Sequence, residues 1–360
     1  MTWAAWADEQ CRQVAAAGQW RTVRDHDAAP STTFASNDYL GLSQHPAVVD
    51  AARAALGRFG AGAGSARLVA GARSVHRQLE AELADWKGTE AAVLFPTGYA
   101  ANLGVLTTFG TAGARILSDE RNHASIVDGC RLARADVDVY DHADLSHVAD
   151  LLAAGPPGRP TVVVTDTVFS MDGDVAPVDK LARLCADHGA LLVLDEAHAV
   201  LGPHPDLDRV EHLRVGTLSK TLGSVGGFVA GSRRFADLLV NRARSFIFTT
   251  APAPADTAAA LAALRVLRSA EGDRLLDRLR GHVTTVAGPA HPSPIVAVIL
   301  GDEQAALDAS AALAAQGLVV PAIRPPTVAP GTSRLRVSLS AAHTDDQVAR
   351  LAEALRALPS

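Results

Sequence analysis

The sequence predicts an α/β protein built on a mostly parallel, seven-stranded sheet with helices on both faces. Short, almost continuously apolar runs recur between residues 91 and 230, and stretches with helical spacing of apolar residues lie between most of them. Strands that are buried on both faces have this composition. The elements after residue 268 are shorter. We therefore expect an N-terminal helix and polar turn in residues 1–40, a large α/β domain in 41–268, and a small α+β domain in 269–360.

The N-terminal part is expected to be a helix followed by a polar turn. Apolar residues recur at helical spacing from Met1 to about Arg24, and Gly18 offers a stop signal. The polar turn at residues 36–42 (SNDYLGL) has little regular structure. Two further helices are expected at residues 46–59 and 74–87. The glycine-rich residues 60–71 between them are no dinucleotide-binding fingerprint, because no apolar strand precedes them.

Seven apolar segments are expected to form the sheet, at residues 91–95, 116–117, 137–140, 161–165, 191–194, 215–217 and 228–230. Helices are expected between most of them, at residues 98–108, 125–134, 145–154 and 178–188. The pair Gly226 and Gly227 permits a tight return, so the last strand can run antiparallel. A long helix then runs to about Ala270. In the C-terminal part, strands are expected at 295–300, 319–320 and 335–339, and helices at 303–316 and 344–358.

The composition is that of an ordinary globular protein. The chain has 360 residues, of which 48% are apolar and 20% charged, and its net charge is −6. A slightly acidic protein lacks the basic footprint of nucleic-acid binding, and no run approaches the ~18 consecutive apolar residues of a membrane span. No secretory signal is visible at the start. Cys11, Cys130 and Cys185 are widely spaced, which favours free buried thiols in a reducing compartment and disfavours a metal site. We expect a cytoplasmic protein.

Lys220 is the residue on which the functional prediction depends. The chain has only three lysines, Lys87, Lys180 and Lys220, and arginine carries the remaining basic charge. Most lysines are solvated surface charges. Lys220, however, lies in a glycine-rich turn after a predicted strand, and Asp195 ends the predicted strand before that one. This pair suits pyridoxal phosphate (PLP), because an amine can hold its aldehyde as a Schiff base and a carboxylate can hold the proton on its ring nitrogen.

Further polar residues follow the predicted strands, at the sheet edge where open α/β sheets bind ligands. Gly98 and Tyr99 open a predicted helix, whose N–H groups suit a phosphate, and Thr217 can contribute there. His123 can stack on the cofactor ring, and His198 and Ser170 can reach its hydroxyl. Lys220 can also shuttle the α-proton of a substrate. Each residue alone is a weak signal; their joint placement predicts the PLP site.

These motifs together resemble the α-oxoamine synthase family of fold-type I PLP enzymes, and the resemblance covers nearly the whole chain. The family joins a small amino acid to an acyl thioester with loss of carbon dioxide. The C-terminal stretch AIRPPTV at 322–328, with PGT at 330–332 and RLR at 334–336, resembles the branch that makes a biotin precursor. That branch uses L-alanine and a pimeloyl thioester of CoA or of a carrier protein.

The resemblance implies further site residues. Asn37 and Arg336 would bind the amino-acid carboxylate. Arg334 and Arg336 share one face of a strand, so spacing does not choose between them. The acyl-binding arginine would be Arg12 or Arg21. Residues 62–67 depart from the family pattern and leave the acyl side open. Two further pairs are implied, Arg324 and Thr327 on the substrate side, and Thr249 and Thr250 at the phosphate of a neighbouring subunit in a homodimer.

Three alternatives are weighed against this reading. Residues 195–198 (DEAH) also occur in helicases, but no lysine here follows the phosphate-binding pattern G-x-x-x-x-G-K-[ST]. A non-catalytic homologue would not be expected to keep Lys220, Asp195, His123 and His198 together. A sister enzyme using glycine and a different acyl-CoA would share the cofactor chemistry. The Arg324-Pro325-Pro326 stretch disfavours it.

Overall fold

The computed structural model describes residues 1–23, 31–156 and 158–358, and the chain forms two compact units. The larger unit comprises Ser36–Val296 and Ser338–Glu353. The smaller unit comprises Met1–Ala35, Ala297–Val337 and Ala354–Ser360. The domain boundaries expected after residues 40 and 268 stay a prediction.

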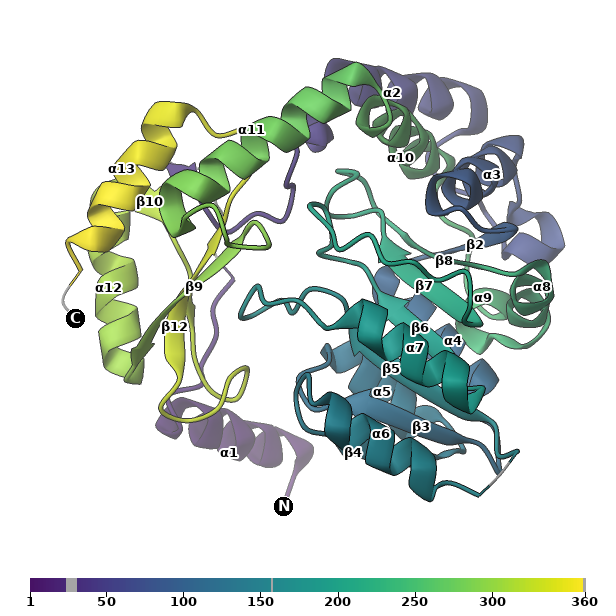
Figure 1. Cartoon of the computed structure of the whole chain (residues 1–360). Helices are drawn as coiled ribbons and strands as arrows, with labels where there is room; N and C mark the ends of the chain where they lie inside the picture. The colour runs from purple at the N-terminus through teal and green to yellow at the C-terminus, as the bar shows by residue number, and fades with distance from the viewer. Residues whose placement is uncertain (24–30, 157, 359–360) are drawn as a thin grey trace. The chain divides into compact units, whose positions relative to one another are not determined.

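The larger unit is built on a seven-stranded sheet with the order β2-β8-β7-β6-β5-β3-β4 (Figure 1). Its strands are β2 (Ala91–Phe95), β3 (Arg115–Asp119), β4 (Asp136–Tyr140), β5 (Thr161–Asp166), β6 (Leu191–Asp195), β7 (His212–Thr217) and β8 (Gly227–Gly231). Only β8 runs antiparallel to its neighbours. The predicted mostly parallel sheet and the reversed last strand are therefore confirmed.

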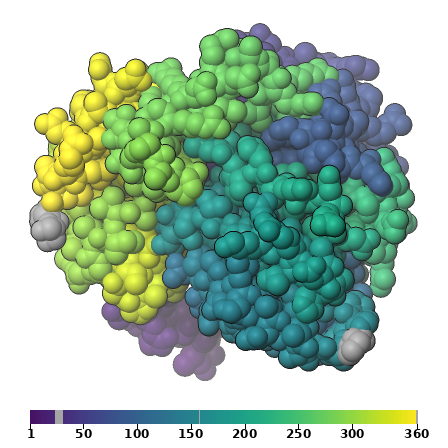
Figure 2. Space-filling view, viewed as in Figure 1, coloured from purple at the N-terminus to yellow at the C-terminus, as the bar shows by residue number. Residues whose placement is uncertain are grey.

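Helices cover both faces of this sheet because the side chains of its strands alternate between two cores. Val162 and Val164 of β5 pack in one core with α4 (Gly98–Phe109), α5 (Ala124–Leu132), α8 (Arg233–Arg242) and α9 (Arg244–Ile247). Val163 packs in the other core with α6 (Leu145–Ala154) and α7 (Val178–His188). The teal side chains of this part of the chain lie on the surface that faces the viewer in Figure 2. The expected covering by helices is confirmed.

A group of helices packs beside the β2 end of the sheet. It contains α2 (Pro46–Phe59), α3 (Ser74–Lys87) and α10 (Pro254–Leu267), which lie side by side in Figure 1. The helix expected to reach Ala270 ends earlier, at Leu267, and a second helix, α11 (Ala270–Ala287), follows with Ser269 as its N-cap. Sequence periodicity does not predict α11, because charged residues and two glycines interrupt its apolar pattern. A short π-helical turn at Arg67–Gly71 is a further unexpected element.

The smaller unit has short strands and helices. A three-stranded sheet has the order β11-β12-β9, and β1 pairs with β10. Its strands are β1 (Thr32–Thr33), β9 (Ile295–Gly301), β10 (Leu318–Val319), β11 (Ala322–Ile323) and β12 (Ser333–Ser338). Its helices include α1 (Trp3–Ala16) and α12 (Glu303–Ala314), while α13 (Asp345–Arg356) lies mostly in the larger unit.

Two expectations about the N-terminal part and the cysteines are corrected. The first helix ends at Ala16, well before Arg24, and Gly18 adopts a left-handed φ of 67° that favours glycine and ends helices. The thiols are free, but only Cys130 and Cys185 are buried, whereas Cys11 is exposed on α1, which buries none of its residues. None of the helices in the described part of the chain has both the length and the apolar composition needed to cross a bilayer.

Candidate active site

The predicted site residues of the larger unit meet at the carboxyl edge of the sheet. Asp195 is the last residue of β6, Thr217 is the last of β7, and Gly98 opens α4 directly after β2. Lys220 lies in the turn that follows β7. This edge is where open α/β sheets bind ligands, because loops and helix N-termini converge there.

A chain of polar contacts connects Lys220 to the polar turn. Lys220 Nζ lies 2.8 Å from His198 Nε2, and His198 Nδ1 lies 2.6 Å from the Tyr39 hydroxyl. That hydroxyl donates to Asn37 Oδ1 at 3.2 Å. Because the Tyr39 hydroxyl donates its proton to Asn37, His198 donates from Nδ1 to the Tyr39 oxygen, and His198 Nε2 accepts from Lys220. Tyr39 is a site residue that sequence reasoning misses; its one signal is its place in the turn at residues 36–42.

The carboxylate of Asp195 is buried and accepts hydrogen bonds from two neutral groups. Asn102 donates from Nδ2 to Oδ2 at 2.6 Å, and the Ala197 N–H donates to Oδ1 at 2.9 Å. The same Asn102 nitrogen donates to Ser125 Oγ at 2.8 Å. Asn102 is a second residue that sequence reasoning misses. Its place one turn into α4 is the available signal, because that turn faces the end of β6.

Asp166 and His123 complete this corner. Asp166 is paired in register with Asp195 on the adjacent strand β5. Burial raises the pKa of Asp166 well above its usual range, and the charge of Asp195 raises it further. Asp166 accepts a hydrogen bond from the backbone N–H of His123 at 2.7 Å. Burial also lowers the pKa of His123, so its imidazole is neutral near pH 7.

The N-terminus of α4 and the end of β7 form an anion-binding corner. Thr97 caps the helix by accepting from the Ala100 N–H, which leaves the first N–H groups of α4 for a ligand. A Cβ placed on Gly98 would lie 3.3 Å from Cβ of Thr217, so glycine keeps this space open. The Thr217 hydroxyl lies 2.7 Å from that of Ser219, a residue not singled out by sequence. Tyr99 is exposed, and its hydroxyl donates to Asp128.

The loop after β5 carries Ser170 and is held by His142. His142 Nδ1 lies 3.0 Å from Asp119 Oδ1, and its Nε2 lies 2.7 Å from Asp174 Oδ2. Its ring also packs edge-on against Phe169, with 4.4 Å between ring centroids. His142 therefore ties the end of β3 to the loop that presents Ser170.

Thr249 and Thr250 follow α9 in the larger unit, where Thr249 is half-buried and Thr250 is exposed. In the smaller unit, Arg334 and Arg336 are both buried on β12. Three other predicted residues of this unit gather near Gly18. Arg324 donates to Gly18 O at 3.2 Å, and Arg21 donates to Thr327 Oγ1 at 3.4 Å.

Arg12, the alternative to Arg21 for the acyl substrate, lies in a different setting. It pairs with Glu9 at 2.7 Å on α1, and 68% of its side chain is exposed. The structure therefore groups Arg21, and not Arg12, with the other predicted acyl-side residues of the smaller unit.

The residues at the sheet edge fit PLP. The donor set contains an amine, a buried carboxylate without a charged partner among the contacts described above, a neutral imidazole, and a helix N-terminus flanked by hydroxyls. Asn102 Oδ1 is buried and has no hydrogen-bond partner among the described residues. Such an orphaned polar atom is expected where a ligand completes a site.

Comparison with known proteins places the chain in a family. Residues 30–355 match Aminotransferase class I and II. The chain belongs to this family. It is 51% identical to an 8-amino-7-oxononanoate synthase of Anaeromyxobacter dehalogenans over 90% of this chain and 85% of that one. A Methylobacterium 8-amino-7-oxononanoate synthase is 48% identical over 95% of this chain and 90% of that one. The predicted family resemblance and fold are thereby confirmed.

Solved structures agree on the fold. A serine palmitoyltransferase from S. paucimobilis, with bound PLP and myriocin, has a TM-score of 0.91 and 29% identity, covering 99% of this chain and 98% of that one. The 8-amino-7-oxononanoate synthase of Francisella tularensis has a TM-score of 0.75 and 28% identity, covering 91% and 97%.

The contacts of His142 predict a pH-dependent stability. Burial alone would lower the pKa of His142, but its hydrogen bonds to Asp119 and Asp174 more than offset this and raise the pKa. A raised histidine pKa stabilises the fold fully below the unfolded value of about 6.5 and loses that contribution as the pH rises through the folded pKa. At pH values above the folded pKa of His142, the free energy of unfolding should be lower by up to about 1 kcal/mol. Urea unfolding at several pH values would measure this as a lower midpoint.

The variant His142→Gln should show a smaller loss of stability between pH 6 and pH 9. His147→Gln is the matched control, because His147 contacts a single carboxylate, that of Asp141, and is more exposed. An unchanged pH profile in His142→Gln would show that His142 does not stabilise the fold through its charge.

Proposed function

We propose that this chain is a PLP-dependent acyltransferase that condenses L-alanine with a pimeloyl thioester, releases carbon dioxide and forms 8-amino-7-oxononanoate, a precursor of biotin. The relatives of that name support this reaction, since they are 45–51% identical over most of the chain. The observation that carries it is the pairing of Lys220 with His198 beside the buried Asp195. A cytoplasmic location is part of the same proposal.

Each proposed site residue of the larger unit has its own task. PLP, when bound, withdraws electron density from the α-carbon of an amino acid. Lys220 Nζ is the amine that holds the cofactor aldehyde, and Asp195 holds the proton on the ring nitrogen. The neutral ring of His123 suits stacking, and Ser170 and His198 suit the ring hydroxyl. The N–H groups at Gly98 and Tyr99 and the hydroxyl of Thr217 suit the phosphate.

The histidine beside Lys220 supports proton handling. A lysine moves a substrate proton only when its amine can be neutral. His198 Nε2 can accept a proton from Lys220 Nζ at 2.8 Å, and Tyr39 orients the ring from the other side at 2.6 Å. Tyr39 is thus a positioning residue. The proposal assigns Lys220 to the transfer of the α-proton of the substrate.

The substrate contacts rest on the family resemblance. Arg336 and Asn37 are proposed to bind the carboxylate of L-alanine, because the planar fork of arginine binds a carboxylate through two hydrogen bonds. Arg21, Arg324 and Thr327 are proposed for the acyl side, which their mutual proximity in the smaller unit supports. A sister reaction with glycine has weaker support, because relatives that are 45–51% identical over most of the chain are named 8-amino-7-oxononanoate synthase.

Covalent trapping tests the cofactor assignment. Borohydride reduction of the PLP-loaded protein should leave a pyridoxyl group on Lys220, because an amine held against a carbonyl forms a reducible bond. Peptide mass spectrometry locates the group. Modification of Lys87 or Lys180 instead would overturn the assignment, and Lys220→Arg, which keeps the charge, should carry no adduct.

A reaction assay tests the substrates. Purified enzyme with L-alanine and pimeloyl-CoA should release carbon dioxide and form 8-amino-7-oxononanoate, detected by mass spectrometry. Arg336→Ala should weaken L-alanine binding by about 1.5–3 kcal/mol, the range for a hydrogen bond to a charged group. The matched variant Arg334→Ala should mainly lower stability. A preference for glycine over alanine in the unmodified enzyme would contradict the named reaction, and reversed effects of the two arginines would exchange their roles.

We further propose a homodimer in which Thr249 and Thr250 reach the phosphate of the neighbouring subunit, since a twofold dimer is the commonest closed assembly. Mixing an inactive Lys220→Ala protein with an inactive Thr249→Ala/Thr250→Ala protein should then restore about a quarter of the activity. Half of the randomly formed dimers would contain one subunit of each variant, and each of these dimers would have one intact site of its two. No recovery after subunit exchange, or an active monomer in sedimentation, would contradict shared sites.

A further inference from the structure

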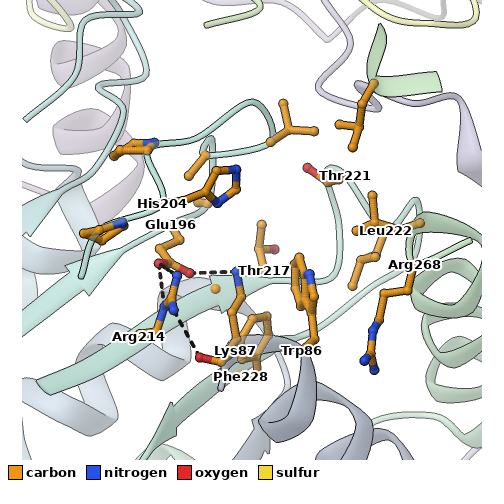
Figure 3. Close-up of a pocket in the computed structure, with 18 of the residues that line it drawn as sticks. Trp86, Lys87, Glu196, His204, Arg214, Thr217, Thr221, Leu222, Phe228 and Arg268 are labelled. Carbon is orange, nitrogen blue, oxygen red and sulfur yellow. Dashed lines mark hydrogen bonds and ion pairs between the residues drawn. The ribbon is translucent and has the colours of Figure 1, made fainter. Parts of the chain in front are cut away.

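A cavity lies beside the ends of β6 and β7, next to the proposed cofactor site, and Thr217, proposed above for the phosphate, is one of its lining residues. Its volume is about 370 Å³, and it belongs entirely to the larger unit. Leu213, Val215 and Val229 of β7 and β8 point into the core with α4 and α5. Arg214 and Phe228 alternate with them and line the cavity (Figure 3). The cavity is thus separated from that core by the thickness of the sheet.

The floor of the cavity is a buried cluster of three charged side chains. Glu196 lies between Lys87 and Arg214, as Figure 3 shows. Its Oε2 lies 2.8 Å from Lys87 Nζ, and its Oε1 lies 2.6 Å from Arg214 Nη2. Arg214 Nη1 also donates to the Lys87 carbonyl at 3.1 Å. These bonds fix the ammonium of Lys87 in place, and they leave the cluster with one excess positive charge.

The ammonium of Lys87 is short of partners for a buried cation. Its side chain is 11% exposed, and Nζ sits 3.6 Å from the centre of the Trp86 ring. Among the described residues, its charged contact is the ion pair with Glu196 Oε2, an oxygen that accepts no hydrogen bond there. Burial lowers the pKa of Lys87, which Glu196 offsets only in part. A further anion against Nζ would relieve this cost.

The remaining lining combines apolar walls with further positive charge. Trp86 and Phe228 form an aromatic wall, with 6.3 Å between their ring centroids, and Leu222, Leu267 and Leu276 add aliphatic surface. A Cβ on Gly216 would lie 2.4 Å from the Phe228 ring, so glycine is required for this wall. Arg268 and Arg280 line the cavity from its more exposed part, with 38% and 53% of their side chains exposed.

We propose that this cavity binds a small organic carboxylate with an apolar body. The carboxylate meets Lys87 Nζ, and the body lies against Trp86 and Phe228. Arg268 and Arg280 are paired with Asp85 and Asp277, so the excess positive charge is the single one of the cluster at the floor, and it favours an anion there. Apolar walls around a few polar anchors are the usual construction of a small-molecule site, and the volume lies in the range of such sites. An inorganic anion would leave these walls in contact with water.

Trp86 provides a built-in reporter of occupancy. The chain has four tryptophans. Replacing the three exposed ones (Trp3→Phe, Trp6→Phe and Trp20→Phe) leaves Trp86 alone in the PLP-loaded full chain. Titration with hexanoate at constant ionic strength should change its emission in a saturable way. The neutral isostere 1-hexanol and inorganic phosphate should each bind at least about tenfold more weakly, because each lacks one of the two features recognised.

Two variants and a second method decide the outcome. In calorimetric titrations of hexanoate, Lys87→Met should weaken binding by about tenfold or more, and the exposed Arg280→Gln by about two- to fivefold. Arg234→Gln, an exposed arginine outside the cavity lining, is the matched control and should change nothing. Equal binding of phosphate and hexanoate, or hexanoate binding that survives both variants unchanged, would overturn the proposal. Because these readouts involve no turnover, their failure leaves the proposed condensation untouched.

Discussion

The buried carboxylate of Asp195 is the constraint around which the site is arranged. A charge removed from water is tolerated only where hydrogen bonds replace its hydration. Asn102 of α4 and the Ala197 N–H supply these bonds. Burial, and then the charge of Asp195, raise the pKa of the adjacent Asp166. The backbone N–H of His123 is in turn anchored on Asp166. One carboxylate therefore determines what α4, α5 and β5 must present at this edge.

The same strand end serves two environments because side chains alternate along β6. Asp195 faces the proposed cofactor, whereas Glu196 lies in the cluster with Lys87 and Arg214. Burial alone would raise the pKa of Glu196, but these two cations more than offset it and lower the pKa. A buried cluster of this kind contributes little net stability but holds its members in one geometry. It fixes the end of β6 against β7, the strand that leads to Lys220, and forms the floor of the cavity lined by Trp86 and Phe228.

The fold alone does not decide the substrate. A serine palmitoyltransferase and an 8-amino-7-oxononanoate synthase both match this chain structurally at 28–29% identity. A shared fold supports several reactions when different side chains surround one cofactor site. The choice of L-alanine and a pimeloyl thioester therefore depends on the more similar relatives and on residues of the smaller unit, which the proposed assays test.

From the sequence alone, apolar runs and their spacing predicted the seven strands, a last strand that can run antiparallel, and the placement of Asp195 and Lys220 after strand ends. These are local signals, because burial on both faces imposes a continuous apolar run. The order of the strands in the sheet came from the structure. The sequence did not predict α11, the early end of α1, or the roles of Tyr39, Asn102 and Asp166. Hydrogen bonds between segments far apart in sequence leave no periodic trace. Only the tertiary structure decided that Tyr39 meets His198 and that Lys87 is buried beside Glu196, because such contacts depend on which chain segments pack together.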